Sequence, residues 1–178
     1  MSSAVYFSLD LVKPLVAVTV LAFTVCLSAG ACAQEVQSKP SKVWAVIENF
    51  GAHTYRVEFR DGSLHYEDAM GATTESAKIT PTAGQWLQFR KALDAIAVWD
   101  WKSSYVPDEA VFDGTTWSFS IRYSDRGVFT SGENCYPEVD ARPCTADVKT
   151  PSFMRLESAI EALLGGKPFR SAAPVATK

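Results

Sequence analysis

The stretch that decides the fold reads Tyr55-Arg-Val-Glu-Phe-Arg-Asp-Gly-Ser-Leu-His-Tyr-Glu67. Its centre, Asp61-Gly62, is typical of a two-residue type I′ turn, and folding the chain about this turn places Phe59 opposite Leu64. Apolar residues then fall on one face of the hairpin, and charged residues fall on the other. The stretch therefore predicts an antiparallel sheet with one dry side and one wet side.

Two later segments have the apolar spacing of amphipathic helices. In each of them, four large apolar residues stand at offsets of zero, three, seven and ten: Trp86, Phe89, Leu93 and Ile96, and then Phe153, Leu156, Ile160 and Leu163. Thr82 and Gln85 have the spacing of a capping box at the start of the first helix, which we expect to run to about Ala97. Gly165-Gly166 ends the second helix. Each helix is expected to cover the sheet.

The remaining stretches complete the predicted sheet. Val43 to Ile47 is rich in strand-forming residues, and Trp117 to Tyr123 alternates apolar with polar side chains before the chain turns into Val128 to Ser131. A bulge at Gly127 leaves the register of this second hairpin open by one residue. The polar stretch from Gly71 to Lys78 is interpreted as a loop. We predict an α+β domain: an antiparallel sheet of about five strands, ordered hairpin, helix, hairpin, helix, with two helices packed on one face.

The amino terminus has the layout of a secretory signal peptide. Lys13 precedes an uncharged run over residues 14–27, and small residues follow up to Ala33. The run is shorter than the roughly 20 apolar residues that a membrane-spanning helix needs. We therefore predict that residues 1–33 are removed by cleavage between Ala33 and Gln34, which leaves no transmembrane segment.

Cys32 leaves an alternative open. It follows four small residues, as the acylated first residue of a lipoprotein would, but Ala29 stands where a large aliphatic residue is expected. We expect a periplasmic or secreted protein, with a form lipid-anchored at Cys32 in the bacterial envelope as the alternative.

Length and charge define the mature protein. Removal of residues 1–33 from the 178-residue chain leaves 145 residues, which suits one domain. We predict a flexible linker over 34–41, a single α+β domain over 42–170 and a disordered tail over 171–178. The net charge is −3 and the basic residues are scattered, so no nucleic-acid partner is expected.

Cysteine usage predicts one disulfide. Cys26 and Cys32 belong to the leader, so Cys135 and Cys144 are the cysteines left in an oxidising compartment. A disulfide between them would close a small ring and stabilise the folded protein by about 2.5 to 3 kcal/mol in the chain-entropy model. Neither a Cys-x-x-Cys pair nor a nearby histidine accompanies them, so no metal or other cofactor is expected.

The sequence contains no recognisable catalytic motif, and we predict no catalytic residue. The Gly-x-Ser-x-Gly elbow, Ser-x-x-Lys, the Walker A loop and Gly-x-Gly-x-x-Gly are absent. In the hairpin register His65 lies across from Glu58, which favours an exposed, partly ion-paired histidine over a general base. His53 precedes the first strand of the hairpin, so it is not expected to share a metal site with His65.

Aromatic and polar residues gather in the predicted loops, where functional residues are common. A stacking platform at Trp99 and Trp101 would suit a sugar or a peptide. The candidate ligand-binding residues are Trp101, Tyr105, Asp113, Asn134 and Tyr136. The alternative is that one or both tryptophans close the end of the core, while Asp113 and Asn134 cap turns.

The spacing of these aromatic residues resembles that of a small bacterial exported domain of unknown function. The resemblance covers residues 83–165 and is carried by three motifs: Trp99-x-Trp101-x-x-x-Tyr105, Asp113-Gly114-Thr115-x-Trp117 and Gly132-x-Asn134-x-Tyr136-Pro137. No activity is known for such a domain, so the resemblance implies none.

Three hypotheses about function follow. The leading one is a non-enzymatic envelope protein that binds a protein, glycan or peptide through the loops around Trp101 and Tyr136. The second is a hydrolase of envelope carbohydrate that uses two loop carboxylates as acid and base, chosen from Asp100, Asp108, Asp113 and Glu133. The third is a structural or assembly component, which needs no pocket.

Overall fold

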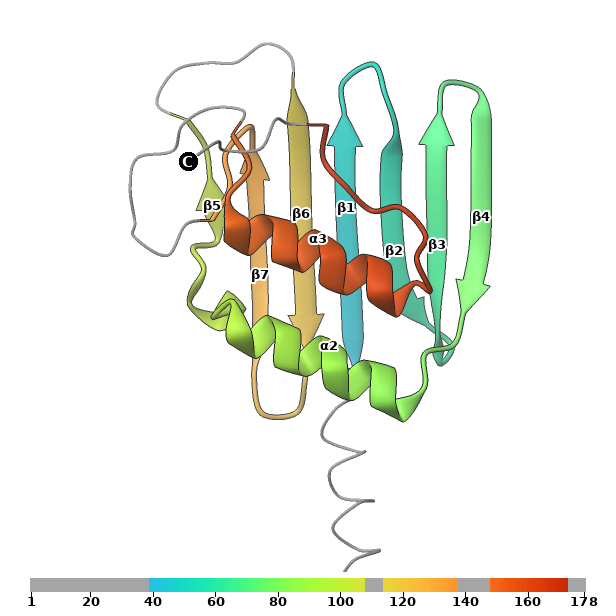
Figure 1. Cartoon of the computed structure of the whole chain (residues 1–178), viewed down its shortest axis with the longest axis vertical. Helices are drawn as coiled ribbons and strands as arrows, with labels where there is room; N and C mark the ends of the chain where they lie inside the picture. The colour runs from blue at the N-terminus through green and yellow to red at the C-terminus, as the bar shows by residue number, and fades with distance from the viewer. Residues whose placement is uncertain (1–38, 108–113, 138–147, 173–178) are drawn as a thin grey trace, which may run out of the picture. The chain divides into compact units, whose positions relative to one another are not determined.

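The computed structural model describes residues 39–107, 114–137 and 148–172. Within this part of the chain, one seven-stranded sheet has the order β4-β3-β2-β1-β6-β7-β5. Its strands are β1 (Lys42–Asn49), β2 (Thr54–Arg60), β3 (Ser63–Met70), β4 (Thr73–Ile79), β5 (Ser104–Tyr105), β6 (Thr115–Arg122) and β7 (Gly127–Glu133). The helices are α2 (Ala83–Ala95), the short 3-10 helix η1 (Val98–Asp100) and α3 (Pro151–Leu163). Helices α2 and α3 lie side by side over the sheet (Figure 1).

The first hairpin has the predicted register. Phe59 pairs with Leu64 and Val57 pairs with Tyr66 across β2 and β3. Asp61 and Gly62 form the turn with φ angles of 50° and 76°, the left-handed conformation that a type I′ turn requires at both positions. The deciding stretch was therefore interpreted correctly from its sequence.

The predicted helix ends are also confirmed. Thr82 caps α2: its hydroxyl accepts a hydrogen bond from Gln85 N at 3.2 Å, and its own N–H donates to Gln85 Oε1 at 2.9 Å. After α3, Gly165 and Gly166 have φ angles of 71° and 90°, which glycine adopts at little cost. The four apolar residues predicted for each helix are all buried.

The second hairpin is regular. Ile121 pairs with Val128 and Arg122 pairs with Gly127, and the same register runs along the whole of β6 and β7. The alternative register with a bulge at Gly127 is therefore not the one adopted.

The prediction of about five strands is wrong, because the sheet has seven. The stretch Gly71 to Lys78, predicted to be a loop, contains most of β4, which pairs with β3 over its whole length. Most β4 side chains are exposed, so this edge strand lacks the apolar alternation that marks a half-buried strand. The second unpredicted strand, β5, has two residues and pairs parallel to β7, which is too short for a sequence signal. The broad α+β class stands.

The ends of the domain are held more tightly than predicted. Ser41, in the predicted linker, donates from its N–H to Arg122 O at 2.8 Å. Ser171 was predicted to begin a disordered tail, but it is 5% exposed, and the next residue, Ala172, donates from its N–H to Asn49 Oδ1 at 2.8 Å. Buried side chains thus bind the backbone of both residues.

Other predictions fall outside the described residues. They concern the leader over residues 1–33 with Cys32, the cleavage site after Ala33, and the loop residues Asp108, Asp113 and Cys144. Cys135 is buried, and its pairing with Cys144 stays a prediction. Within the described ranges, no helix has the length and apolar character needed to cross a membrane.

Candidate functional site

Three of the predicted ligand-binding residues lie around Trp117, a buried residue on the helix-facing side of β6. The centroid of its ring is 6.0 Å from that of Tyr105, 6.4 Å from that of Tyr136 and 6.5 Å from that of Trp101. Phe153 of α3 completes the cluster at 4.8 Å. Tyr136 is buried, whereas Trp101 and Tyr105 are partly buried. The fold thus brings the predicted loop aromatics together, but as a packed cluster.

Polar atoms of this aromatic cluster bond to the backbone of the domain itself. Trp117 Nε1 donates to Cys135 O at 2.8 Å, and Trp101 Nε1 donates to Ile96 O at 3.2 Å. The Tyr105 hydroxyl accepts a backbone N–H three residues earlier at 2.9 Å. Burial raises the pKa of the Tyr105 phenol. These contacts favour the alternative stated above, in which the rings close the end of the core.

Trp99 packs against different partners and does not share a platform with Trp101. Its ring lies 4.9 Å from the Arg90 guanidinium and 5.4 Å from that of Arg126. The same Arg90 guanidinium lies 4.3 Å from the centroid of the Tyr123 ring. Cation–π contacts of this kind stabilise the join between α2 and the β6–β7 turn. These contacts reduce the surface of the Trp99 ring that a ligand could touch.

Asn134, another predicted binding residue, holds strand ends together. It is 2% exposed, its Oδ1 accepts from Thr115 N at 2.6 Å, and its own N–H donates to Thr115 O at 2.9 Å. The Thr115 hydroxyl then donates to Asn49 Oδ1 at 2.9 Å. Gly114 lies so close that a Cβ on it would be 1.7 Å from Asn134 Oδ1. Asn134 therefore joins the ends of β1, β6 and β7.

The described carboxylates of the hydrolase hypothesis do not converge. Asp100 and Glu133 are both exposed. Strand β5 runs parallel to β7 and pairs with its final part, so Asp100, which precedes β5, lies toward the opposite end of β7 from Glu133. A glycosidase needs its two carboxyl groups about 5 to 10 Å apart. The strand pairing gives no support for such a pair at Asp100 and Glu133, and Asp108 and Asp113 lie outside the described residues.

A contact between His53 and Asp68 was missed from the sequence. His53 Nδ1 lies 2.5 Å from Asp68 Oδ1, and the His53 ring stacks on Tyr55 with centroids 5.6 Å apart. The contact could have been predicted from the hairpin register. That register places Asp68 opposite Tyr55, and Tyr55 is two residues from His53. His65 lies opposite Glu58, as predicted, but it is half-buried rather than exposed, and its Nδ1 lies 3.3 Å from Arg60 Nη2. In the part of the chain that the structure describes, no group of three or more His, Cys, Asp or Glu residues could hold a metal ion.

Three exposed apolar side chains lie at one end of the sheet, on strands that are two to five positions apart in the strand order. Phe50 is 73% exposed, Met70 is 51% exposed and Val106 is 60% exposed. They come directly after β1, at the end of β3 and directly after β5, and these strands run in the same direction. In Figure 1 this is the end of the sheet to which the arrowheads of β1 and β3 point. Ser41, which bonds to Arg122 just before β1 begins, lies at the opposite end of the strands. We call the surface formed by Phe50, Met70 and Val106 the distal edge.

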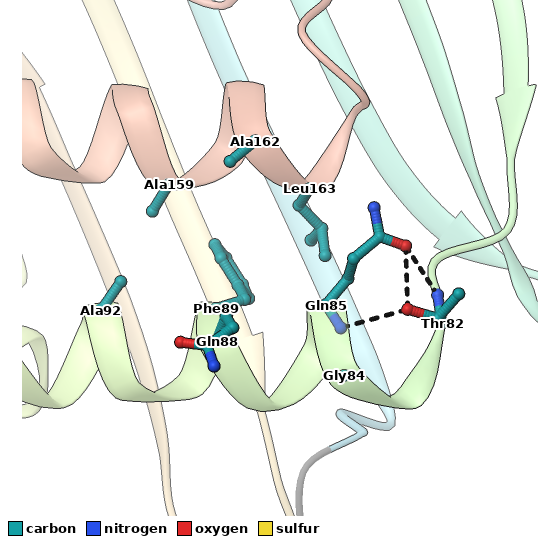
Figure 2. A pocket seen from close by; sticks show the side chains of 9 residues that line it. All are labelled: Thr82, Gly84, Gln85, Gln88, Phe89, Ala92, Ala159, Ala162 and Leu163. Carbon is teal, nitrogen blue, oxygen red and sulfur yellow. Dashed lines mark hydrogen bonds between the residues drawn. The ribbon is translucent and has the colours of Figure 1, made fainter.

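A groove of about 620 Å³ lies between α2 and α3 (Figure 2). The space exists because both helices present small side chains there, namely Ala92, Ala159 and Ala162. None of the lining residues is charged, and Thr82 and Gln85 are bonded to each other in the capping box. The groove therefore offers few groups that could orient a polar ligand.

A buried ion pair holds the segment that follows α3. Lys149 Nζ lies 3.2 Å from Glu157 Oε2, and the two residues are 8% and 5% exposed. Both also bind the backbone of Ser171: Lys149 donates to its carbonyl at 3.1 Å, and Glu157 Oε1 accepts from its N–H at 2.5 Å. The charges thus compensate one another and satisfy two backbone groups.

The ion pair predicts a dependence of stability on pH. Burial raises the pKa of the Glu157 carboxyl above its ordinary value of 4.5, against the opposing effects of its Ser171 and Lys149 contacts. Folded protein then holds the proton more tightly than unfolded protein, so the contribution of Glu157 to stability is fully present below its ordinary pKa and is lost as the pH rises through the raised one. Glu157→Gln keeps the acceptor but does not titrate.

Urea unfolding of both proteins between pH 4 and pH 7 checks this expectation. We expect the free energy of unfolding of the wild type, relative to Glu157→Gln, to fall as the pH rises. A difference that stays constant or increases over this range would contradict the raised pKa.

No family model matches the chain, and no curated protein matches it. The resemblance to a small exported domain stays an expectation drawn from the aromatic spacing, and proposals about function rest on the chain's own residues.

Proposed function

We propose that the chain is an exported, non-enzymatic interaction domain of the bacterial cell envelope, and that it binds a partner protein through the distal edge. Export is proposed from the layout of the leader. The observation that carries the interaction role is that Phe50, Met70 and Val106, three exposed apolar side chains, lie at the same end of the sheet. A protein interface of ordinary size covers about 800 Å² on each partner, so one partner protein can cover all three side chains.

The chemistry of the distal edge suits a protein partner. Phe50 and Met70 are each followed by Gly and Ala in their turns, so no large neighbour prevents either side chain from entering a pocket. Aromatic residues and methionine are enriched in protein interfaces, and a flexible thioether adapts to irregular apolar surfaces. Trp101 and Tyr105 would add only their exposed parts, beside Val106.

The other two hypotheses have less support. A carbohydrate hydrolase needs two converging carboxylates, and Asp100 and Glu133 lie toward opposite ends of β7. A purely structural component needs no exposed apolar grouping, so loss of partner binding on substitution of the distal edge distinguishes it from the proposed role.

Combined substitution of Phe50, Met70 and Val106 by serine is expected to weaken partner binding at least tenfold, since apolar anchors dominate binding energy. Stability is expected to change by no more than about 0.5 kcal/mol for each substitution, because the side chains are exposed. A photo-crosslinking amino acid at position 50, in the exported protein in living cells, should give one discrete adduct. Binding of the purified adduct partner is then measured by calorimetry with the wild type and the triple variant.

The matched control places the same crosslinker at Phe129, which is 59% exposed on β7 but lies outside the distal edge. An adduct at position 50 that disappears in Met70→Ser and Val106→Ser backgrounds, with none at position 129, supports the proposal. Equal adducts at both positions, or binding that is unchanged in the triple variant, would exclude the distal edge as the binding surface.

A further inference from the structure

Strand β4 forms one side of the sheet, and no described element pairs with its outer edge. All seven of its residues pair with β3 in one register, from Thr73 opposite Met70 to Ile79 opposite Leu64. It contains neither proline nor glycine, and the pairing shows no bulge. Proteins block long edge strands with proline, bulges or charged side chains, because unpaired backbone groups bind other strands. Of these features β4 has only the charged residues Glu75 and Lys78. The opposite edge strand, β5, has only two residues.

The turn before β4 determines which of its backbone groups are free. Gly71, with φ 59°, and Ala72 form a two-residue turn closed by Met70 and Thr73. The closing pair of such a hairpin exchanges both hydrogen bonds, so the odd-numbered residues of β4 bond to β3. The alternate residues direct their N–H and C=O groups away from the sheet: Thr74, Ser76 and Lys78.

We propose that β4 pairs antiparallel with β4 of a second copy of this chain, about a twofold axis that is perpendicular to the sheet and passes midway between the two Ser76 residues. In this register Ser76 lies opposite Ser76 of the second copy, and Thr74 lies opposite its Lys78. The three outward residues of each copy then exchange six backbone hydrogen bonds, counted from the β4 pairing and the antiparallel pattern. The two sheets become continuous.

Side chains select this register over its neighbours. On the helix-facing side, Thr73 lies opposite Ile79 and Glu75 lies opposite Ala77, so no like charges lie directly opposite each other. The two Glu75 residues become diagonal neighbours, and each keeps its ion pair with Lys167 of its own copy at 2.6 Å. Centring the pair on Glu75 instead would place two carboxylates directly opposite each other, which is destabilising. Centring it on Ala77 would leave Thr74 without a partner residue inside the strand. The register on Ser76 uses all the outward groups and places no like charges directly opposite each other.

A second copy fits this edge because a twofold interface needs a self-complementary surface. The antiparallel arrangement points the distal edges of the two copies in opposite directions. If the distal edge binds a partner as proposed above, the dimer presents one such surface at each end. The pairing of β4 does not itself depend on that function.

Sedimentation of the exported protein over a range of concentrations measures the dimer. We expect Ser76→Pro to weaken dimerisation at least tenfold, because proline lacks the N–H at the axis, while pairing with β3 remains. Ser76→Ala keeps the backbone and should dimerise like the wild type. Should Ser76→Pro fail to fold, Ser76→Lys tests the same point by placing two like charges at the axis.

Cysteine substitution locates the axis. Hydrogen-bonded residues opposite each other lie about 5.5 Å apart between Cα atoms, which is within reach of a disulfide. Ser76→Cys should therefore form a covalent dimer on mild oxidation, whereas Lys91→Cys, exposed on α2, should not. The proposal is overturned if the wild type stays monomeric and Ser76→Cys forms no covalent dimer. It is also overturned if the dimer persists in both Ser76→Pro and Ser76→Lys. Neither readout involves distal-edge binding, so the two proposals can fail separately.

Discussion

Replacement of Trp117 by alanine is expected to lower the free energy of unfolding by about 3–5 kcal/mol, the cost of removing a large buried aromatic side chain. Trp117 is 3% exposed and touches four other rings, so the surrounding residues cannot collapse fully into the space that it leaves. The substitution also removes the donor to Cys135 O. A domain of this size is typically stable by only about 5–15 kcal/mol, so much of its stability would be lost.

Urea unfolding followed by far-ultraviolet circular dichroism measures this loss. The matched control is Trp44→Ala, because Trp44 is half-buried on the open face of β1 and has Arg56 at 5.7 Å from its ring. We expect that control to cost about 1 kcal/mol or less. Similar losses for the two tryptophans would mean that the rings around Trp117 are not part of the core, and would restore them as candidates for ligand binding.

Replacement of Lys149 by alanine is expected to cost about 3–5 kcal/mol, the usual effect of removing one partner of a buried ion pair. Glu157 would be left buried without its cation, and the Ser171 carbonyl would lose its donor. Chemical unfolding at pH 7 measures the loss. Faster amide hydrogen exchange at Ser171 should accompany it, because the segment after α3 is held by these contacts.

The control for Lys149 is Arg155→Ala, which removes an exposed cation from the same region and should change stability by no more than about 0.5 kcal/mol. A Lys149→Ala protein as stable as this control would show that Glu157 and Ser171 find other partners.

The elements that the sequence predicts correctly are governed by local rules. The Asp61-Gly62 turn fixes a hairpin register within a few residues, and a capping box at Thr82 with helical apolar spacing marks α2 without reference to the rest of the chain. Strand β4 was missed for the same reason. An exposed edge strand is specified by its hydrogen-bonded neighbour, and its own side chains carry little pattern.

The candidate site was predictable only as a group of residues. The aromatic spacing correctly draws attention to Trp101, Tyr105 and Tyr136, which do lie together, but spacing does not distinguish a surface cluster from a packed one. That distinction depends on Trp117 and Phe153, which β6 and α3 bring to the same place from distant parts of the sequence.

The first hairpin, the two helices and the apolar face of the sheet can be predicted from the sequence, because each depends on contacts between residues close along the chain. Only the three-dimensional arrangement shows which loop residues are buried, that Lys149 and Glu157 bind the segment after α3, and that Phe50, Met70 and Val106 lie at one end of the sheet. The physical reason is that burial and proximity between distant residues depend on strand order and helix placement. Neither quantity is encoded in a local pattern of apolar and polar residues.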